Sequence, residues 1–415
     1  MLYLFIFLFP WQIVFIWQEN FLGGEKWQYG TYLTYGTELL LWVIILLYFI
    51  SKYYSSEKLV INKKKCFLAS LFIVWAGLSI FFSADNELSL YHWLRLLEGG
   101  LLFFIILGTK LDLKKVSWSF VLAGVFQSVL AMDQFFFQRI IASKWLGMSQ
   151  QLSEDLGVVV ISDGAHRFLR AYGTFSHPNV LGGFLVVCLM FSLLIYFFHS
   201  SGRLKVISLA FGILIFVAVL FSFSRSAILA FLLSYALLYI YLLSKKRFWE
   251  ATKVLSYLAL VFILLFSLYQ SLFITRLEAS EELEVNSVQL RFDSIDTSKD
   301  IIGDNFMFGV GIGNYTYVLA NNNPGLMAWQ YQPVHNIFLM VFSELGIIGF
   351  MIFSLLCVSL FSFSVYNIKS NPIGVSLLVI VFTIGLFDHY LWTNYVGIIL
   401  FWLVLALTTQ KTNEI

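Results

Sequence analysis

Long apolar stretches with very few charges dominate this sequence and restrict what it can fold into. A helix needs about 20 apolar residues to cross the hydrocarbon core of a bilayer, which is roughly 30 Å thick. The stretches that meet or approach this length are residues 2–18, 33–50, 66–83, 88–108, 116–137, 179–198, 206–223, 226–243, 254–273, 335–366, 373–388 and 394–410. The sequence therefore predicts an all-α integral membrane protein with about twelve transmembrane helices, the tenth of which begins outside the hydrocarbon.

Composition supports a membrane protein and excludes other classes. Hydrophobic residues make up 60% of the 415 residues and charged residues 12%, whereas soluble domains average about 45–50% and about 25%. This composition excludes a soluble or disordered chain. The 26 Lys and Arg are balanced by 24 Asp and Glu, so there is no strongly basic character that would indicate a nucleic-acid partner. We predict a lipid bilayer as the surroundings and no nucleic acid.

The distribution of Lys and Arg predicts the orientation. Sixteen of them fall in the connections 51–65, 109–115, 199–205, 244–253 and 367–372 and in the C-terminal tail, including Lys58, Lys246 and Lys411. The opposite side holds nine, spread over longer loops. Short cytoplasmic loops carry an excess of Lys and Arg. Both termini are therefore predicted on the cytoplasmic side of a multi-pass protein.

Two outer loops are much longer than the other connections, at residues 138–178 and 274–334. Long loops in compact proteins are usually functional or disordered. The second contains the run Gly309-Val310-Gly311-Ile312-Gly313-Asn314-Tyr315 and aromatic residues, a composition that favours ordered structure with short helices. We treat residues 1–415 as a single polytopic membrane domain that carries these two loops.

Three arginines lie at the outer edge of the predicted spans. Arg170 precedes the sixth span, Arg225 occupies the tight break between the seventh and eighth spans, and Arg291 lies in the large loop. Arginine at such positions favours bidentate recognition of phosphate or carboxylate. The alternative is ordinary contact with lipid headgroups.

Histidines and an aspartate also lie at outer positions. His335 opens the tenth span, and its titration near neutral pH suits a general base; the alternative is an interfacial histidine bonded to the backbone. Asp388 and His389 form the turn between the last two spans and are candidates for acceptor binding or support of the site. Within the fourth span, Arg95 and Glu98 have a spacing that predicts a structural ion pair.

The catalytic motifs of several enzyme classes are missing. The sequence contains no His-Glu-x-x-His, Walker loop or Gly-x-Ser-x-Gly, which disfavours zinc proteolysis, ATP hydrolysis and esterase chemistry. The three cysteines fall in apolar segments without metal-ligand spacing. We predict no metal and no cofactor.

An ordered set of short motifs resembles the O-antigen ligase and O-antigen polymerase superfamily. The matching pieces are Arg170-x-x-Gly173-Thr174-Phe175-x-His177-Pro178-Asn179, Ser224-Arg225-Ser226, Arg291 with Gly309-x-Gly311-x-Gly313-Asn314-Tyr315, and His335-Asn336 with Glu344-x-Gly346-x-x-Gly349. Each piece is short, but their order and spacing match over about residues 165–350.

The resemblance implies a lipid-dependent, membrane-embedded glycosyltransferase of the C type in the cytoplasmic (inner) membrane. Such enzymes move a glycan from an undecaprenyl or other polyprenyl diphosphate to an acceptor hydroxyl on a glycan, lipid or protein at the outer face. Arg170, Arg225 and Arg291 would then bind the donor diphosphate and His335 would be the base. His177 and Asn179, together with Asp388 and His389, would contact the acceptor or support these groups.

The remaining questions concern the class of protein and the type of transfer. A secondary transporter of a polar or anionic solute would also explain twelve spans, but it predicts charges near the bilayer midplane. Most candidates here are expected at the outer edge, with Arg95 and Glu98 the exceptions. The resemblance leaves open whether the enzyme is a ligase or a polymerase in lipopolysaccharide or other cell-envelope polysaccharide biosynthesis.

Overall fold

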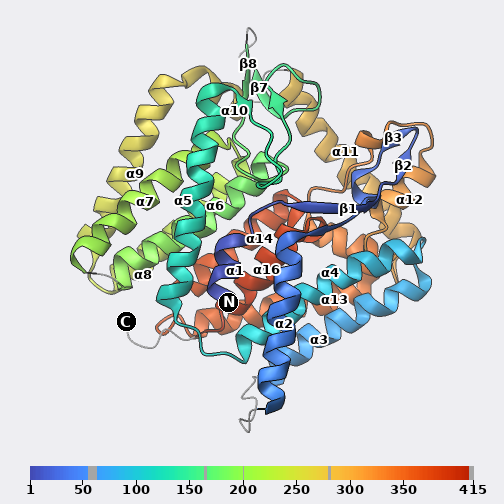
Figure 1. The fold of residues 1–415 in the computed structure, drawn as a ribbon, viewed down its shortest axis with the longest axis horizontal. Coiled ribbons are helices and arrows are strands. Elements are labelled where there is room, and N and C mark those ends of the chain that lie inside the picture. The colour runs from blue at the N-terminus through green and yellow to red at the C-terminus, as the bar shows by residue number, and fades with distance from the viewer. Residues whose placement is uncertain (55–62, 163–165, 200, 279–281, 411–415) are drawn as a thin grey trace.

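The computed structural model describes residues 1–54, 63–162, 166–199, 201–278 and 282–410, and they form a mainly helical protein (Figure 1). Lys58 and Lys411, two of the basic residues used to predict orientation, lie outside the described residues. The helices are α1 (Leu2–Leu8), α2 (Gly36–Tyr54), α3 (Lys63–Leu78), α4 (Asn86–Leu107), α5 (Leu113–Phe137), α6 (Pro178–Leu194), α7 (Gly202–Phe221), α8 (Arg225–Ser244), α9 (Phe248–Leu268), α10 (Gln270–Glu278), α11 (Glu282–Asp304), α12 (Tyr315–Asn322), α13 (Ile337–Tyr366), α14 (Gly374–Phe387), α15 (Tyr390–Thr393) and α16 (Tyr395–Leu407).

Four short antiparallel strand pairs accompany the helices in the described part of the chain. They are β1 (Val14–Gln18) with β4 (Tyr32–Tyr35), β2 (Phe21–Leu22) with β3 (Glu25–Lys26), β5 (Arg139–Ile140) with β6 (Gln151–Leu152), and β7 (Val160–Ser162) with β8 (Arg167–Leu169). In Figure 1 these hairpins and helices α10–α12 lie toward the top and right. The predicted outer loops therefore gather at one end of the molecule.

Fewer of the described helices are long enough to cross a membrane than the twelve that the sequence predicts. Within the described residues, eight helices are long and apolar enough to cross a membrane, and the apolar helices at Cys66–Phe82, Gly374–Phe387 and Tyr395–Leu407 are shorter. The predicted span 2–18 is wrong: α1 ends at Leu8, and Val14–Gln18 form the exposed strand β1. Pro10 comes after the C-cap Phe9, and proline cannot continue the hydrogen-bond ladder of a helix.

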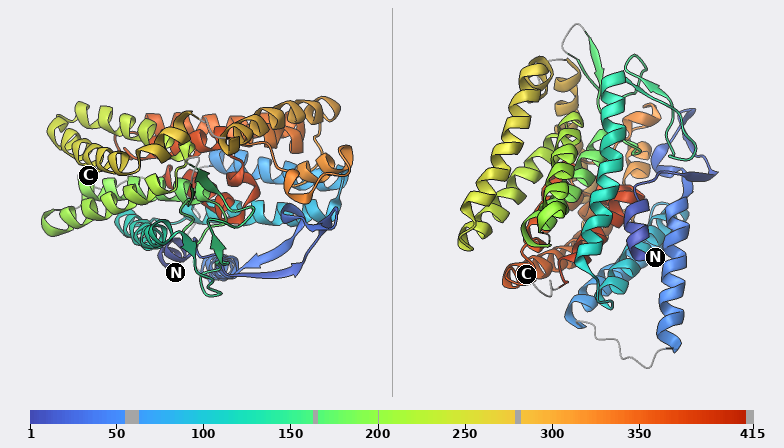
Figure 2. Two further views of the ribbon diagram at one scale, coloured as in Figure 1. Left: turned by 90° about the horizontal axis from the view of Figure 1, so that it is seen from above. Right: turned by 60° about the vertical axis from the view of Figure 1, so that its left-hand side comes forward.

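Helix α6 forms the centre of the molecule. Every residue from Pro178 to Leu194 is buried, and the helix packs against α5, α7, α8 and α14. In Figure 2, α7–α9 lie on one side of this core and α2–α4 with α13 on the other. A Cβ on Gly183 would lie 1.9 Å from Tyr390 Oη, so this glycine allows α15 to lie against α6, as small residues do between membrane helices.

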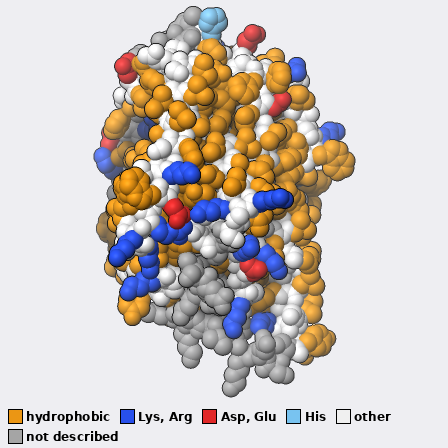
Figure 3. Space-filling view, turned by 90° about the vertical axis from the view of Figure 1, so that its left-hand side faces the viewer, with side chains coloured by type: hydrophobic (Ala, Val, Ile, Leu, Met, Phe, Trp, Pro, Cys, Tyr) orange, Lys and Arg blue, Asp and Glu red, His pale blue; other side chains and the backbone are white. Residues whose placement is uncertain are grey.

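Large apolar side chains cover much of the molecular surface. On α9, Leu260, Ile263 and Leu268 each expose more than 60% of their area. Figure 3 shows a face on which apolar side chains dominate and Lys and Arg side chains gather in one band. A soluble protein rarely exposes apolar patches of this extent, so the surface fits a protein embedded in lipid.

The large loop is more helical than expected. Instead of short helices alone, it contains α11, which has 23 residues. The glycine-rich run that follows packs on a kink in α13, where Gly346 has φ 64°. The backbone N–H groups of Val310 and Gly311 donate to the carbonyls of Ser343 and Glu344. This part of the motif therefore builds the frame around the site.

The ion pair predicted between Arg95 and Glu98 does not form. Arg95 donates to the carbonyl of Leu33 at 2.9 Å and its guanidinium lies 4.4 Å from the Tyr91 ring centroid. Glu98 accepts a hydrogen bond from Trp42 at 2.6 Å. The i, i+3 spacing allowed the pair, but each side chain takes its hydrogen-bond partner from a neighbouring element instead.

Candidate functional site

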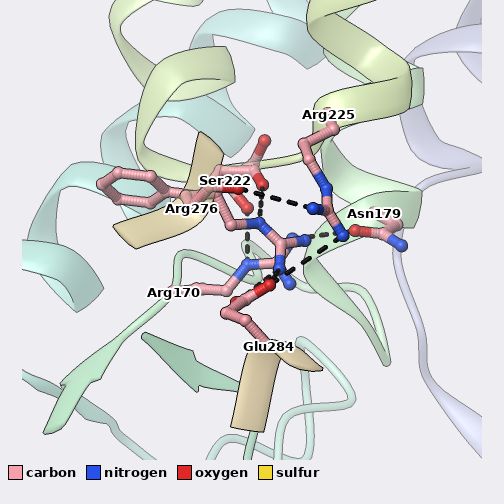
Figure 4. Close-up of polar contacts among 7 residues, drawn as sticks. Arg170, Asn179, Ser222, Arg225, Arg276 and Glu284 are labelled. Carbon is pink, nitrogen blue, oxygen red and sulfur yellow. Dashed lines mark hydrogen bonds and ion pairs between the residues drawn. The ribbon is translucent and has the colours of Figure 1, made fainter. Parts of the chain in front are cut away.

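Arg225 and Arg276 meet at the turn between α7 and α8. Arg225 is the first residue of α8, directly after the N-cap Ser224. Arg276, on α10, is buried and donates through Nε to the carbonyl of Phe223 in this turn at 3.0 Å. One Nη of Arg225 contacts the Arg276 carbonyl at 3.4 Å. The turn therefore fixes two guanidinium groups next to each other (Figure 4).

Arg170 contacts the same turn. Its Nε donates to the carbonyl of Ser222 at 2.8 Å and its Nη2 donates to Oδ1 of Asn179 at 2.8 Å. The side chain is buried and does not line the cavities described below. In this structure Arg170 holds the α7–α8 turn and Asn179 in place, while its predicted contact with a diphosphate stays a prediction.

Arg276 is a residue that the sequence reasoning missed. It follows the ninth predicted span at the start of the large loop, where a fourth outward arginine could have been noticed. Its guanidinium forms an ion pair with Glu284 of α11, which also lies 3.9 Å from Arg225. Figure 4 shows Glu284 pointing at the guanidinium groups.

A cavity of about 410 Å³ opens beside these arginines. Its polar lining consists of Arg225, Ser226, Arg276, Arg291, Asn179, His335 and Asn336, and its apolar lining consists of Leu229, Val288, Phe292, Ile295, Leu386 and Phe387. Phe292, Leu386 and Phe387 are exposed at the surface. The cavity thus joins a cationic end to an apolar wall, and we call it the arginine cavity.

Helix N-termini add to the positive potential of the arginine cavity. Arg225 begins α8, Asn336 caps α13 by accepting from the N–H groups of Phe338 and Leu339, and Asn179 lies in the first turn of α6. The N-terminus of a helix carries a partial positive charge and favours anions. Three such ends and three arginines therefore favour an anionic ligand.

A second cavity, of about 520 Å³, adjoins the arginine cavity at His335 and Asn179. Its lining is polar and aromatic and includes Tyr29, Tyr35, Tyr91, Arg95, Tyr172, His177, Trp329, Gln332, Asp388, His389 and Asn394. His335 and Asn179 line both cavities. We call this the aromatic cavity.

The histidines and Asp388 gather where the two cavities meet. The rings of His335 and His389 have centroids 5.0 Å apart. Nδ1 of His335 is buried and, within the described residues, has no hydrogen-bond partner. Asp388 accepts from Asn179 Nδ2 at 2.7 Å and from the backbone N–H of His389 at 2.9 Å. Of the residues predicted from sequence, Asn179, Arg225, Arg291 and His335 thus line the arginine cavity, whereas Arg170 does not.

Burial keeps the imidazoles at this junction neutral. The pKa of His335 is lowered, first by burial and then by Arg291, although Asp388 acts in the opposite direction. Burial also lowers the pKa of His389 and of His177 to about 3 each. Burial alone raises the pKa of Asp388, but the hydrogen bond that Asn179 donates favours the ionised carboxylate, and the pKa is lowered. Neutral imidazoles beside a carboxylate can accept a proton.

The remaining motif residues have structural roles. His177 caps α6 by accepting from the N–H of Asn179 at 3.0 Å. Glu344 is buried and accepts a hydrogen bond from Trp392 at 2.7 Å, so it joins α13 to α15. Within the part of the chain that the structure describes, no group of three or more His, Cys, Asp or Glu side chains could hold a metal ion.

Comparison with known families agrees with the resemblance predicted from the sequence. Residues 209–354 match the family model described as O-antigen ligase. No curated protein matches the chain. The matched residues include Arg225, Arg276, Arg291 and His335, while Arg170 and Asp388 lie outside them. The match supports the predicted place of this chain in the O-antigen ligase superfamily and indicates a glycosyltransferase-like enzyme of the membrane.

Proposed function

We propose that this protein transfers a glycan from a polyprenyl diphosphate carrier to an acceptor hydroxyl at the outer face of the inner membrane. The observation that carries the proposal is that His335 and Asn179 line both the arginine cavity and the aromatic cavity. A donor in the first and an acceptor in the second would then meet at a residue able to accept a proton.

The arginine cavity has the chemistry that a lipid diphosphate requires. Arg225, Arg276 and Arg291 offer guanidinium groups to the phosphate oxygens, which they can bind in bidentate fashion. The exposed apolar wall of Leu229, Phe292 and Phe387 offers the polyprenyl tail a route from the bilayer. The arginine cavity therefore offers one surface to the charged diphosphate and another to the apolar polyprenyl tail.

The proposed reaction uses both cavities. The acceptor oxygen attacks the anomeric carbon and gives its proton to His335, while the bond between that carbon and the phosphate oxygen breaks. The electron pair of the broken bond stays on the diphosphate. Guanidinium groups fixed around it stabilise the developing charge, as donors do in an oxyanion hole. Direct displacement inverts the configuration of the anomeric carbon.

The aromatic cavity suits the acceptor. Small-molecule sites combine aromatic walls with a few placed polar groups, and here tyrosines alternate with Gln332, Asn394 and the histidines. The rival interpretation, a secondary transporter, is not favoured: most charged candidates lie at the predicted outer end, and the family match indicates glycan transfer.

Purified protein in lipid nanodiscs, supplied with a synthetic polyprenyl diphosphate glycan and candidate acceptors, tests the proposal. We expect release of polyprenyl diphosphate and a product whose anomeric configuration, read by NMR, is inverted. A carbohydrate profile of a deletion strain separates the two types of transfer: intact chains without attachment indicate a ligase, and single repeats indicate a polymerase. Full donor turnover in both Arg225→Ala and His335→Ala would refute the proposed site.

A further inference from the structure

Glu284 is a buried carboxylate beside Arg170, Arg225 and Arg276, which we call the arginine cluster. The proposed reaction does not use this carboxylate. It lies on α11 with 4% of its surface exposed. Its carboxylate forms an ion pair with Arg276 and lies 3.9 Å from Nη2 of Arg225. In Figure 4 it points toward the guanidinium groups of Arg276 and Arg170. Within the described residues, it is the carboxylate that contacts the arginines of this cluster.

Electrostatics explains why an anion belongs at this position. Like charges that are buried together repel each other, and each also loses its hydration. The carboxylate of Glu284 offsets part of this cost while the cavity is empty. It does so by accepting hydrogen bonds from N–H groups of Arg276. Phosphate oxygens in the arginine cavity would accept hydrogen bonds from the same N–H groups.

We propose that Glu284 is a resident anion that competes with the phosphate groups of the lipid diphosphate for Arg276 and Arg225, and so limits how tightly donor and product bind. This inference rests on the proposed function. The leaving diphosphate gains negative charge during the reaction, so arginines without an internal competitor would hold the product too long. Glu284 returns to Arg276 as the diphosphate leaves, and the site is free for the next donor.

A purely structural role for Glu284 predicts a different outcome. If Glu284 only ties α10 to α11, its loss lowers stability and weakens or leaves unchanged the binding of phosphate ligands. If it competes, its neutralisation lowers stability but tightens binding. The two readouts change in opposite directions only in the second case.

Binding of inorganic pyrophosphate to the purified full-length protein tests this difference. The variants are Glu284→Gln, which removes the charge at nearly constant shape, and Glu284→Asp, which draws the carboxylate back. Asp296→Asn is the matched control, because Asp296 is an exposed carboxylate on the same helix, paired with Lys299. Isothermal titration calorimetry gives the affinity, and the thermal midpoint without ligand gives the stability.

We expect Glu284→Gln to bind pyrophosphate roughly tenfold or more tightly than the wild type, since a charge-assisted contact no longer has to be displaced. Its thermal midpoint without ligand should fall. Glu284→Asp should bind pyrophosphate with an affinity between those of the wild type and Glu284→Gln. If the Gln variant does not fold, the Asp variant replaces it in the test. In turnover assays, kcat should fall together with the KM for the donor, because product release slows.

The negative outcomes separate this inference from the proposed function. If the wild type binds pyrophosphate and Arg225→Ala weakens that binding, but neither Glu284 variant tightens it, the competition proposal is wrong and the donor site stands. If wild type and Arg225→Ala both fail to bind pyrophosphate and to use a polyprenyl diphosphate donor, the proposed function itself fails.

Discussion

The side-chain amide of Asn179 donates a hydrogen bond of 2.7 Å to the carboxylate of Asp388. The oxygen of the same amide accepts from Arg170 at 2.8 Å. Asn179 thus links Arg170, which holds the α7–α8 turn, to the turn that carries Asp388 and His389. Because it lines both cavities, it also fixes the distance between the two halves of the site.

The first prediction concerns this link. Asn179→Ala leaves buried polar atoms of Arg170 and Asp388 without these partners, which costs about 1–3 kcal/mol for such a group. We expect a lower thermal midpoint and reduced donor turnover. Asn322→Ala, at an exposed position on α12, is the control and should match the wild type. Wild-type stability in Asn179→Ala would show that the link is dispensable.

The second prediction concerns the geometry of Arg225. Arg225→Lys keeps the positive charge but loses the planar fork. A bidentate contact to an ionised group contributes about 1.5–3 kcal/mol, so turnover should fall by about one to two decades. Arg139→Lys, an exposed arginine of β5, serves as the control. Unchanged turnover in Arg225→Lys would leave only a role for its charge.

The third prediction tests His335 as the base. General-base help contributes about two to four decades in rate, so His335→Ala should lose that much turnover while pyrophosphate binding stays close to wild type. His335→Gln keeps hydrogen bonding without basicity and should be equally slow. If the Gln variant turns over normally, His335 only orients the acceptor, and His389 becomes the next candidate.

The fourth prediction is the pH dependence. Burial and Arg291 lower the pKa of His335 below its ordinary value of 6.5. The neutral imidazole is the active form, so turnover should fall as pH drops through this lowered pKa and stay level above pH 6.5. Asp388 raises the pKa of His335. Asp388→Asn should therefore shift the acid limb to still lower pH, and a limb that moves upward would contradict this assignment.

The fifth prediction concerns orientation, which follows from the unequal distribution of Lys and Arg. A cysteine introduced at Asn322, exposed on α12, should react with a membrane-impermeant maleimide added to sealed cells. A cysteine at Lys246, exposed after α8, should react only after the cells are opened. Labelling of the Lys246 site from outside would reverse the orientation and move the proposed chemistry to the wrong side.

Most helices could be predicted from sequence because the cost of polar groups in lipid is a local property. A helix satisfies its own backbone hydrogen bonds, so an apolar stretch of sufficient length identifies it without its neighbours. The predicted spans at 116–137 and 226–243 thus agree with α5 and α8. The first span failed because apolar residues 14–18 are also good strand formers once Pro10 has ended the helix.

The site was only partly predictable. Arg225, Arg291 and His335 could be named because charges at the outer ends of apolar spans are conspicuous, and the structure brings them to one cavity. Arg276 and Glu284 resembled ordinary charges of a polar loop. What distinguishes them is burial, which arises only when α10 and α11 fold over the α7–α8 turn.

The sequence by itself determined the helical membrane character, the position of the arginines at the ends of apolar stretches and the chemistry that those side chains offer, because these depend on composition and on short-range order. The tertiary structure decided which groups meet: it replaced the expected Arg95–Glu98 pair, placed Arg170 behind Asn179, and set His335 between two cavities. Contacts between residues far apart in the chain depend on how helices pack, and no local pattern of residues records that packing.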